Sequence, residues 1–150
     1  MAQNPRTPSE DFAAIGRRAV ELGYALERDS EVQKLRGRVG SHGVEIVVPG
    51  GEVWEWYLSV TESESDSEVF STWSEYWIDA SAGLPSAKEV VEHLVAEVTL
   101  ALELLEGASE LRVAKGEGLR FLGRELFAGK VLELRVEEHW TPFEQLLHGA

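Results

Sequence analysis

The sequence predicts an α+β domain in which a mostly antiparallel sheet packs against one long helix, with an N-terminal helix and a short C-terminal helix in addition. Three observations predict this fold. Apolar residues recur every three or four positions in segments 8–22 and 87–106, which is the period of a helix with one buried face. Between and after these segments the apolar residues alternate, as they do in strands. Short turn sequences separate the alternating runs, so neighbouring strands are expected to pair antiparallel.

The length and composition indicate one domain. A chain of 150 residues is the usual size of a single domain and can bury an ordinary core. Its hydrophobic share of 43% and charged share of 27% are those of globular proteins. We expect residues 1–6 to form a flexible arm and residues 7–150 to form one α+β domain. The arm contains no apolar signal core, and no run approaches the roughly 18 apolar residues of a membrane helix.

The charge of the chain restricts the class of partner. Asp and Glu number 27 against 14 Lys and Arg, which gives a net charge of −13. Nucleic-acid phosphates and anionic membrane surfaces are held by clustered cations, so we expect neither direct nucleic-acid binding nor membrane binding. The acidity instead suits a basic protein partner, or serves solubility alone. The absence of cysteine excludes disulfides and thiolate metal sites, and it fits a cytoplasmic protein.

The first helix has recognisable signals at both ends. Thr7-Pro8-Ser9-Glu10 has the pattern of a capping box, with proline at the first helical position. Gly23 suits the left-handed residue that ends a helix, and Tyr24 is expected to pack just after it. Residues 25–42 have a mixed pattern that is compatible with a frayed helical turn or with an edge strand.

Three strands are expected next. The alternating runs 44–48 and 54–60 flank Pro49-Gly50-Gly51, which predicts a β-hairpin. A third strand is expected from Val69 to Asp79. Its two faces carry Trp73 and Trp77 on one side, and Phe70, Tyr76 and Ile78 on the other. Apolar groups on both faces predict a central strand, or a strand with an exposed aromatic face.

A long helix and further strands complete the chain. Ser86-Ala87-Lys88-Glu89 is a second capping-box pattern, and Gly107 ends the helical stripe that follows. The later strand candidates are residues 111–113, 119–121 and 131–137. Thr141-Pro142-Phe143-Glu144 is expected to begin the last short helix.

No pattern of residues predicts catalysis, a cofactor or a metal, so we expect a non-enzymatic protein. Glu89, His93 and Glu97 share one helix face at four-residue spacing, which suits a divalent metal. The same spacing is more common on a solvated helix face opposite an apolar stripe, and we prefer that interpretation. The acidic segment 62–68 lacks the glycine and the spacing of a calcium loop. Gly116-x-Gly118 lacks the rest of a phosphate-binding fingerprint.

The most informative cluster is aromatic. It comprises Trp54, Trp56, Trp73, Tyr76 and Trp77, which fall on two adjacent strands beside the acidic segment 62–68. These side chains form a tryptophan-rich core under the long helix, or some of them reach the surface. Exposed aromatic side chains bordered by carboxylates suit the docking of a basic protein patch, or they line a small-ligand pocket. The candidate partner-binding residues are Glu62, Glu64, Asp66, Glu68, Trp54, Trp56, Trp73 and Trp77.

Leu22-Gly23-Tyr24 at the end of the first helix, followed by a Trp-bearing hairpin, resembles immunity proteins of bacterial polymorphic toxin systems. Those small acidic proteins bind and block a cognate toxin domain. The resemblance covers residues 1 to about 80. It does not match any known binding residue of the family to a position in this chain. It implies a tight one-to-one complex with a basic toxin domain, to which segment 62–68 and exposed tryptophans contribute.

Other functions are also compatible with the sequence. The order of elements resembles that of small acidic chaperones of type III secretion, which implies a homodimer that holds an unfolded effector segment. A small enzyme or ligand-binding protein requires a Trp-lined pocket with two titratable groups within hydrogen-bond reach. A DNA mimic requires carboxylates spaced like phosphates over a surface.

Overall fold

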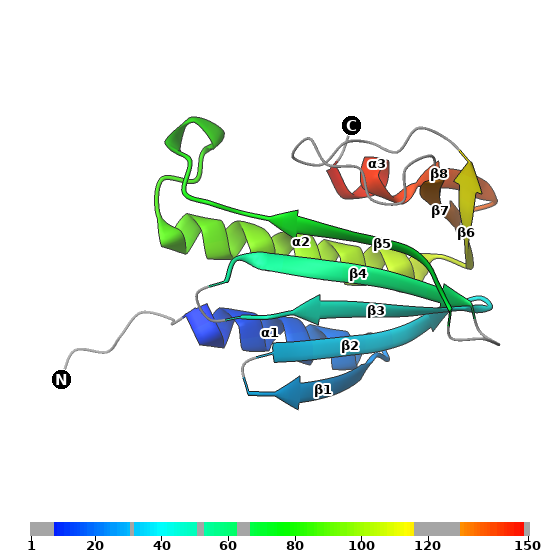
Figure 1. Ribbon diagram of the computed structural model, residues 1–150, viewed down its shortest axis with the longest axis horizontal. Helices are drawn as coiled ribbons and strands as arrows, with labels where there is room; N and C mark the ends of the chain where they lie inside the picture. Colours follow the sequence, from blue (N-terminus) through cyan, green and yellow to red (C-terminus); the bar gives the residue numbers. More distant parts are fainter. Residues whose placement is uncertain (1–7, 31, 51–52, 63–66, 116–129, 149–150) are drawn as a thin grey trace.

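The computed structural model describes residues 8–30, 32–50, 53–62, 67–115 and 130–148. Figure 1 shows the helices and strands along the chain. In chain order they are α1 (Pro8–Glu21), β1 (Ala25–Asp29), β2 (Val32–Val39), β3 (His42–Val48), β4 (Glu55–Glu62), β5 (Glu68–Glu75), the 3₁₀ turn η1 (Ala80–Ala82), α2 (Ala87–Gly107), β6 (Glu110–Lys115), β7 (Lys130–Val136), β8 (His139–Pro142) and α3 (Phe143–His148). The predicted arm 1–6, the cap Thr7, the pair Gly116-x-Gly118 and the predicted strand 119–121 lie outside the described residues.

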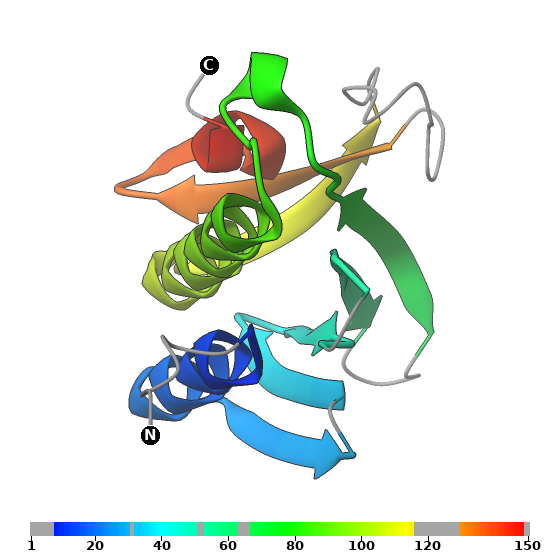
Figure 2. The same cartoon turned by 90° about the vertical axis from the view of Figure 1, so that its left-hand side faces the viewer.

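The strands form two antiparallel sheets around the long helix α2. One sheet has five strands in the order β1-β2-β3-β4-β5, and the other has three in the order β6-β7-β8. Figure 2 shows α1 and α2 side by side against one face of the five-stranded sheet, with the three-stranded sheet and α3 beyond α2. The predicted α+β class, the antiparallel pairing, the long helix and the two flanking helices are confirmed.

The strand alternative for residues 25–42 is confirmed, because β2 pairs with β3 from Gln33 to Val39 and β1 adds to β2 as an edge strand. One prediction about strands is wrong. The third predicted strand ends at Glu75 and does not continue to Asp79. Of the two alternatives for that strand, β5, the exposed aromatic face is the one found: β5 is the other edge of the described sheet, and its uncovered outer face carries the partly exposed Trp73.

One buried cluster of apolar side chains holds both sheets and the helices together. It draws on α1, on β2 to β5, on α2, on β6 and β7, and on α3. Its largest fully buried members include Trp56, Phe143, Ile15, Leu35, Ile46, Leu58, Leu94, Leu102, Leu105, Leu111 and Leu134. Each Leu, Ile or Val of this kind stabilises the fold by roughly 1.5–3 kcal/mol relative to an exposed position. None of the helices in the described part of the chain combines the length and the apolar composition needed to cross a membrane.

The end of α1 confirms the predicted stop at Gly23. Its φ is +95°, the Gly23 N–H donates to the carbonyl of Val20 at 3.0 Å, and the Tyr24 N–H donates to that of Ala19 at 2.9 Å. These are the paired bonds of a Schellman motif, which satisfy carbonyls at the helix end. Tyr24 then turns back into the core, where its hydroxyl donates to the carbonyl of Leu102 at 3.1 Å.

The start of α2 differs from the predicted capping box. Ser86 is the N-cap residue, but its side chain makes no bond to the helix backbone. Its hydroxyl instead donates to the carboxylate of Glu89. The apolar stripe of α2 is as predicted, because its buried side chains are Val90, Val91, Leu94, Val98, Ala101, Leu102 and Leu105.

The hairpin between β7 and β8 has an unusual turn. Val136 pairs with His139, so Glu137 and Glu138 form a two-residue loop, and their φ values are +51° and +71°. Positive φ at both central residues marks a type I′ turn, which normally takes Asn-Gly. A left-handed conformation costs a non-glycine residue roughly 1–2 kcal/mol. Two glutamates are not a turn signal, so the sequence does not predict the hairpin that joins β7 to β8.

Replacing this turn by Asn-Gly is expected to stabilise the protein. The double variant Glu137→Asn/Glu138→Gly should raise the free energy of unfolding by about 1–2 kcal/mol, because its residues adopt positive φ with less strain. Urea unfolding monitored by circular dichroism measures the change. Glu137→Gln/Glu138→Gln is the control, since it removes both charges and keeps the backbone strain. An equal gain in both variants contradicts the backbone explanation.

Candidate protein-binding face

The face of the five-stranded sheet opposite the helices, the outer face, is not covered by any described helix or strand (Figure 2). The register aligns Lys34, Val47, Tyr57 and Trp73 in one row across β2, β3, β4 and β5. Their strand neighbours Trp56 and Leu58 point the other way, into the core, since 1% and 0% of their surfaces are exposed. Tyr57 is 37% exposed, so the outer face presents an accessible aromatic ring on β4, next to the edge strand β5.

Two carboxylates lie beside these rings. Glu55 and Glu75 are cross-strand partners on β4 and β5, one step along the outer face from the pair Tyr57 and Trp73. The Tyr57 hydroxyl donates to Glu55 Oε1, and Trp73 Nε1 donates to Glu75 Oε1 at 2.9 Å. We call these four residues the acidic–aromatic patch. Each ring is held by the carboxylate two residues along its own strand, so the patch is ordered before any partner arrives.

The electrostatics of the patch keep the tyrosine protonated. The hydrogen bond to Glu55, burial and the charges of Glu55 and Glu75 together raise the pKa of Tyr57 to about 12. The hydroxyl is therefore a fixed donor at neutral pH, and the negative charge of the patch stays on the two carboxylates. Like charges directly opposite each other on neighbouring strands are destabilising, so this pairing is an unfavourable feature of the isolated sheet.

On the other half of the outer face, a cation offsets part of the negative charge. The Arg36 guanidinium contacts Glu27 at 3.0 Å and Glu45 at 2.6 Å. The hydrogen bond from Arg36 to Glu45 and the nearby carboxylates raise the pKa of Arg36 further, so it stays charged. Over β4 and β5, by contrast, Glu55 and Glu75 accept hydrogen bonds from the neutral donors Tyr57 and Trp73.

Exposed apolar side chains extend the patch beyond the ends of the strands. The Tyr76 N–H donates to the carbonyl of Trp54 at 2.8 Å, which carries the β4–β5 pairing one residue further. Val53 and Trp77 occupy the next positions and are 46% and 49% exposed. The half-exposed Val53 and Trp77 therefore lie at one end of the patch, and Glu62 and Glu68 lie at the opposite ends of β4 and β5.

The structure places two of the predicted partner-binding tryptophans at or near the surface and the other two against the core. Trp73 lies in the patch, and Trp77 is half exposed next to it. Trp56 is 1% exposed and Trp54 packs partly against the core, so these two fit the core interpretation, and Trp56 cannot touch a partner.

The predicted acidic residues divide in a similar way. Glu62 and Glu68 are exposed at the ends of β4 and β5, and Glu68 accepts a hydrogen bond from Ser59 at 2.7 Å. Glu64 and Asp66 lie outside the described residues.

Beneath the sheet, a polar network joins the predicted aromatic cluster to the helix face that carries His93 and Glu97. Trp56 Nε1 donates to the Tyr76 hydroxyl at 2.9 Å, and the side chain of Glu97, only 9% exposed, accepts from Ser74 at 3.4 Å. Burial and the charge of Glu97 raise the pKa of Tyr76 well above its usual range, and its hydroxyl also hydrogen-bonds Glu97. The network keeps Tyr76 neutral and ties β4 and β5 to α2.

The expectation for Glu89, His93 and Glu97 is only partly met. His93 Nε2 lies 3.5 Å from Glu97, whereas Glu89 binds the Ser86 hydroxyl instead. Among the described residues, no three His, Asp or Glu side chains come together as metal ligands. The side chain of His93 is 53% exposed and that of Glu97 only 9%, so this helix face is solvated at His93, as the preferred interpretation predicted, and covered at Glu97.

Sequence reasoning did not select Glu55, Tyr57 and Glu75 as binding residues. Alternation along residues 54–60 already turned Glu55 and Tyr57 away from Trp56, and this was the available signal for them. No local pattern places Glu75 opposite Glu55, because that contact depends on the register between β4 and β5.

Comparison of the chain with family models, with curated proteins and with solved structures gave no match in any of the three.

Proposed function

We propose that this chain is a protein-binding module that docks a basic region of another protein on its acidic–aromatic patch, as an immunity-type inhibitor of a toxin domain does. The observation that carries the proposal is the cross-strand pair Glu55 and Glu75 flanked by Tyr57 and Trp73. An Arg or Lys of the partner placed there contacts two carboxylates and an aromatic face together. It also relieves the repulsion between the two carboxylates.

The charge of the chain supports the same partner class. A net charge of −13 attracts a basic protein over a long range and raises its association rate, most strongly at low salt. Rigid aromatic side chains at the centre of a face supply binding energy at low entropic cost, and they are frequent among the residues that dominate interfaces. Trp77 and Val53 add apolar area at the rim of the patch.

Removing the patch is expected to abolish tight binding and to leave the fold intact. When the tagged protein is co-expressed with the products of neighbouring open reading frames and purified, it should retain one basic partner in a one-to-one complex. The partner should be toxic alone and harmless in the complex. Trp73→Ala should weaken that complex by about 2 kcal/mol or more, roughly thirtyfold. Glu55→Gln/Glu75→Gln should mainly lower the association rate and flatten its dependence on salt. Surface plasmon resonance measures both.

The control variant removes the same charge elsewhere. Glu92→Gln/Glu106→Gln changes the net charge by the same amount on α2, where both side chains are exposed. If its association rate falls as far as that of Glu55→Gln/Glu75→Gln, only the overall charge matters and the patch is not the docking site. A partner that binds all variants alike overturns the proposal, as does a captured partner that is acidic.

A further inference from the structure

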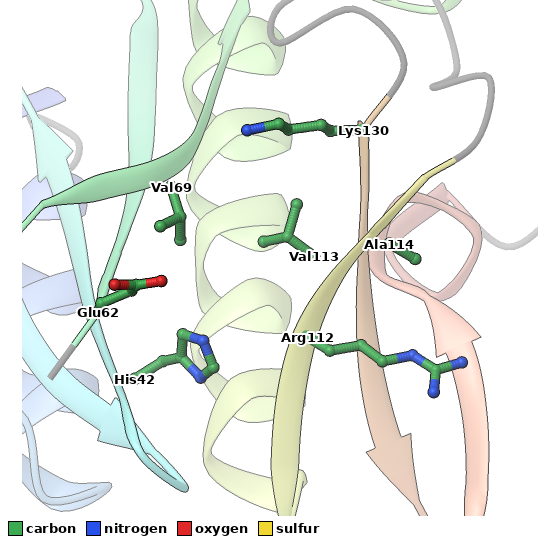
Figure 3. A pocket seen from close by; sticks show the side chains of 7 residues that line it. All are labelled: His42, Glu62, Val69, Arg112, Val113, Ala114 and Lys130. Carbon is green, nitrogen blue, oxygen red and sulfur yellow. The ribbon is translucent and has the colours of Figure 1, made fainter.

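A cavity of about 450 Å³ lies where the two sheets diverge, on a different surface from the acidic–aromatic patch. One wall comes from β3, β4 and β5, and the opposite wall from β6 and β7 (Figure 3). The lining residues are His42, Glu62, Val69, Arg112, Val113, Ala114 and Lys130. Its volume falls in the range of roughly 300–1,000 Å³ that is usual for small-molecule sites.

The polar groups of the cavity stand at inward-facing positions where the core ends. His42 and Glu62 are cross-strand partners, and they continue the inward series of buried valines on β3 and β4. Lys130, at the start of β7, continues the inward series of buried leucines on its strand. Both sheets thus place a charged residue at a core-facing position, and Figure 3 shows Glu62, His42 and Lys130 turned toward the same space.

Two features point to a ligand in this space. Glu62 on one wall and Lys130 on the other supply groups of opposite charge, which favour an occupant that carries both charges. Val69 and Val113 supply apolar walls between the charged groups. Arg112 does not contribute, because it pairs with Glu133 at 2.8 Å, stacks on Trp140 at 4.1 Å and points away in Figure 3.

We propose that the cavity binds a small zwitterion, an aliphatic α-amino acid. Its ammonium group contacts Glu62, its carboxylate contacts Lys130, and its side chain packs against Val69 and Val113. The two opposite charges on the walls select against the simpler ligands, because Glu62 repels an acid that lacks an amine and Lys130 repels an amine that lacks an acid.

Isothermal titration calorimetry with L-leucine tests the proposal on the full chain. Saturable one-to-one binding is expected, and isoamylamine and 4-methylpentanoate, which each lack one of the two charges, should bind about tenfold more weakly or worse. Equal binding of either truncated compound overturns the zwitterion assignment. Absence of saturable binding by L-leucine, L-valine and L-isoleucine at millimolar concentration overturns the site.

Variants locate the binding. Glu62→Gln and Lys130→Met should each weaken L-leucine binding about tenfold, and Val69→Phe should block it by filling the cavity without removing a charge. Glu92→Gln, at an exposed position of α2, is the matched control for the loss of one carboxylate. Circular dichroism confirms that each variant is folded. Binding that persists in all three cavity variants places the ligand elsewhere and overturns the proposal. Glu55→Gln/Glu75→Gln should bind L-leucine normally, so this result is independent of the proposed docking face.

Discussion

Replacing Trp56 by alanine is expected to lower the free energy of unfolding by about 3–5 kcal/mol. The side chain is 1% exposed and is among the largest in the core. Its removal leaves a cavity under α2 and takes away the indole N–H that donates to the Tyr76 hydroxyl at 2.9 Å. Because single domains are stabilised by only about 5–15 kcal/mol, this one change should bring the protein close to unfolding. Chemical denaturation at 25 °C provides the measurement.

Two further variants separate the contributions of Trp56. Trp56→Phe keeps most of the buried ring area and removes the hydrogen bond, so we expect a smaller loss of about 1–2 kcal/mol. Trp77→Ala removes a tryptophan that is 49% exposed and should change stability by no more than about 0.5 kcal/mol. If Trp56→Ala proves no more destabilising than Trp77→Ala, Trp56 is not the core residue described above.

Replacing Gly37 by alanine is expected to cost about 1–3 kcal/mol. A Cβ at this position on β2 lies 2.7 Å from Cε1 and 2.8 Å from Cδ1 of Tyr24, well inside normal contact distance. Tyr24 has little room to move, because it is 7% exposed and its hydroxyl donates to the carbonyl of Leu102. The absence of a side chain at Gly37 therefore leaves room for the Tyr24 ring to pack against β2. The free energy of unfolding in urea measures the cost.

The control for Gly37 is another glycine without close neighbours. At Gly107, at the end of α2, an added Cβ would meet no described atom within 4 Å, so Gly107→Ala should be neutral or stabilising. In a Tyr24→Leu background the Gly37→Ala substitution should lose most of its cost, because the ring atoms it meets are gone. An unchanged cost in that background would show that the clash with Tyr24 is not the cause.

Local sequence signals predicted the helices and their ends, because the hydrogen bonds of a helix join residues that are close in the sequence. Three- and four-residue periodicity placed α1 and α2, and Gly23 marked the end of α1 by a conformation that glycine adopts without steric cost. Alternation also put Trp56 on the same face as Leu58 and Val60, which is the core face of β4. The composition alone excluded cysteine chemistry and made a basic partner the natural hypothesis.

Pairing between strands decided what local patterns left open. Residues 25–42 became β1 and β2 because β3 supplies a partner along the length of β2, and a helical turn there would leave β3 without that partner. The strand from Val69 ends at Glu75, and β5 became an edge because no described strand pairs on its far side. Trp73 is partly exposed because no described element covers the outer face of the sheet, as is also the case for Tyr57 on the interior strand β4.

Only the tertiary structure decided which residues form the candidate sites. Alternation assigns Glu55 to a face of its strand, but the register between β4 and β5 brings Glu75 opposite it. The cavity likewise joins Glu62 to Lys130 from separate sheets that meet only when both pack around α2. A one-residue slip of register turns every side chain of a strand to the other face. The sequence by itself therefore determined the elements and the chemistry available to them, and long-range packing determined which of those groups meet.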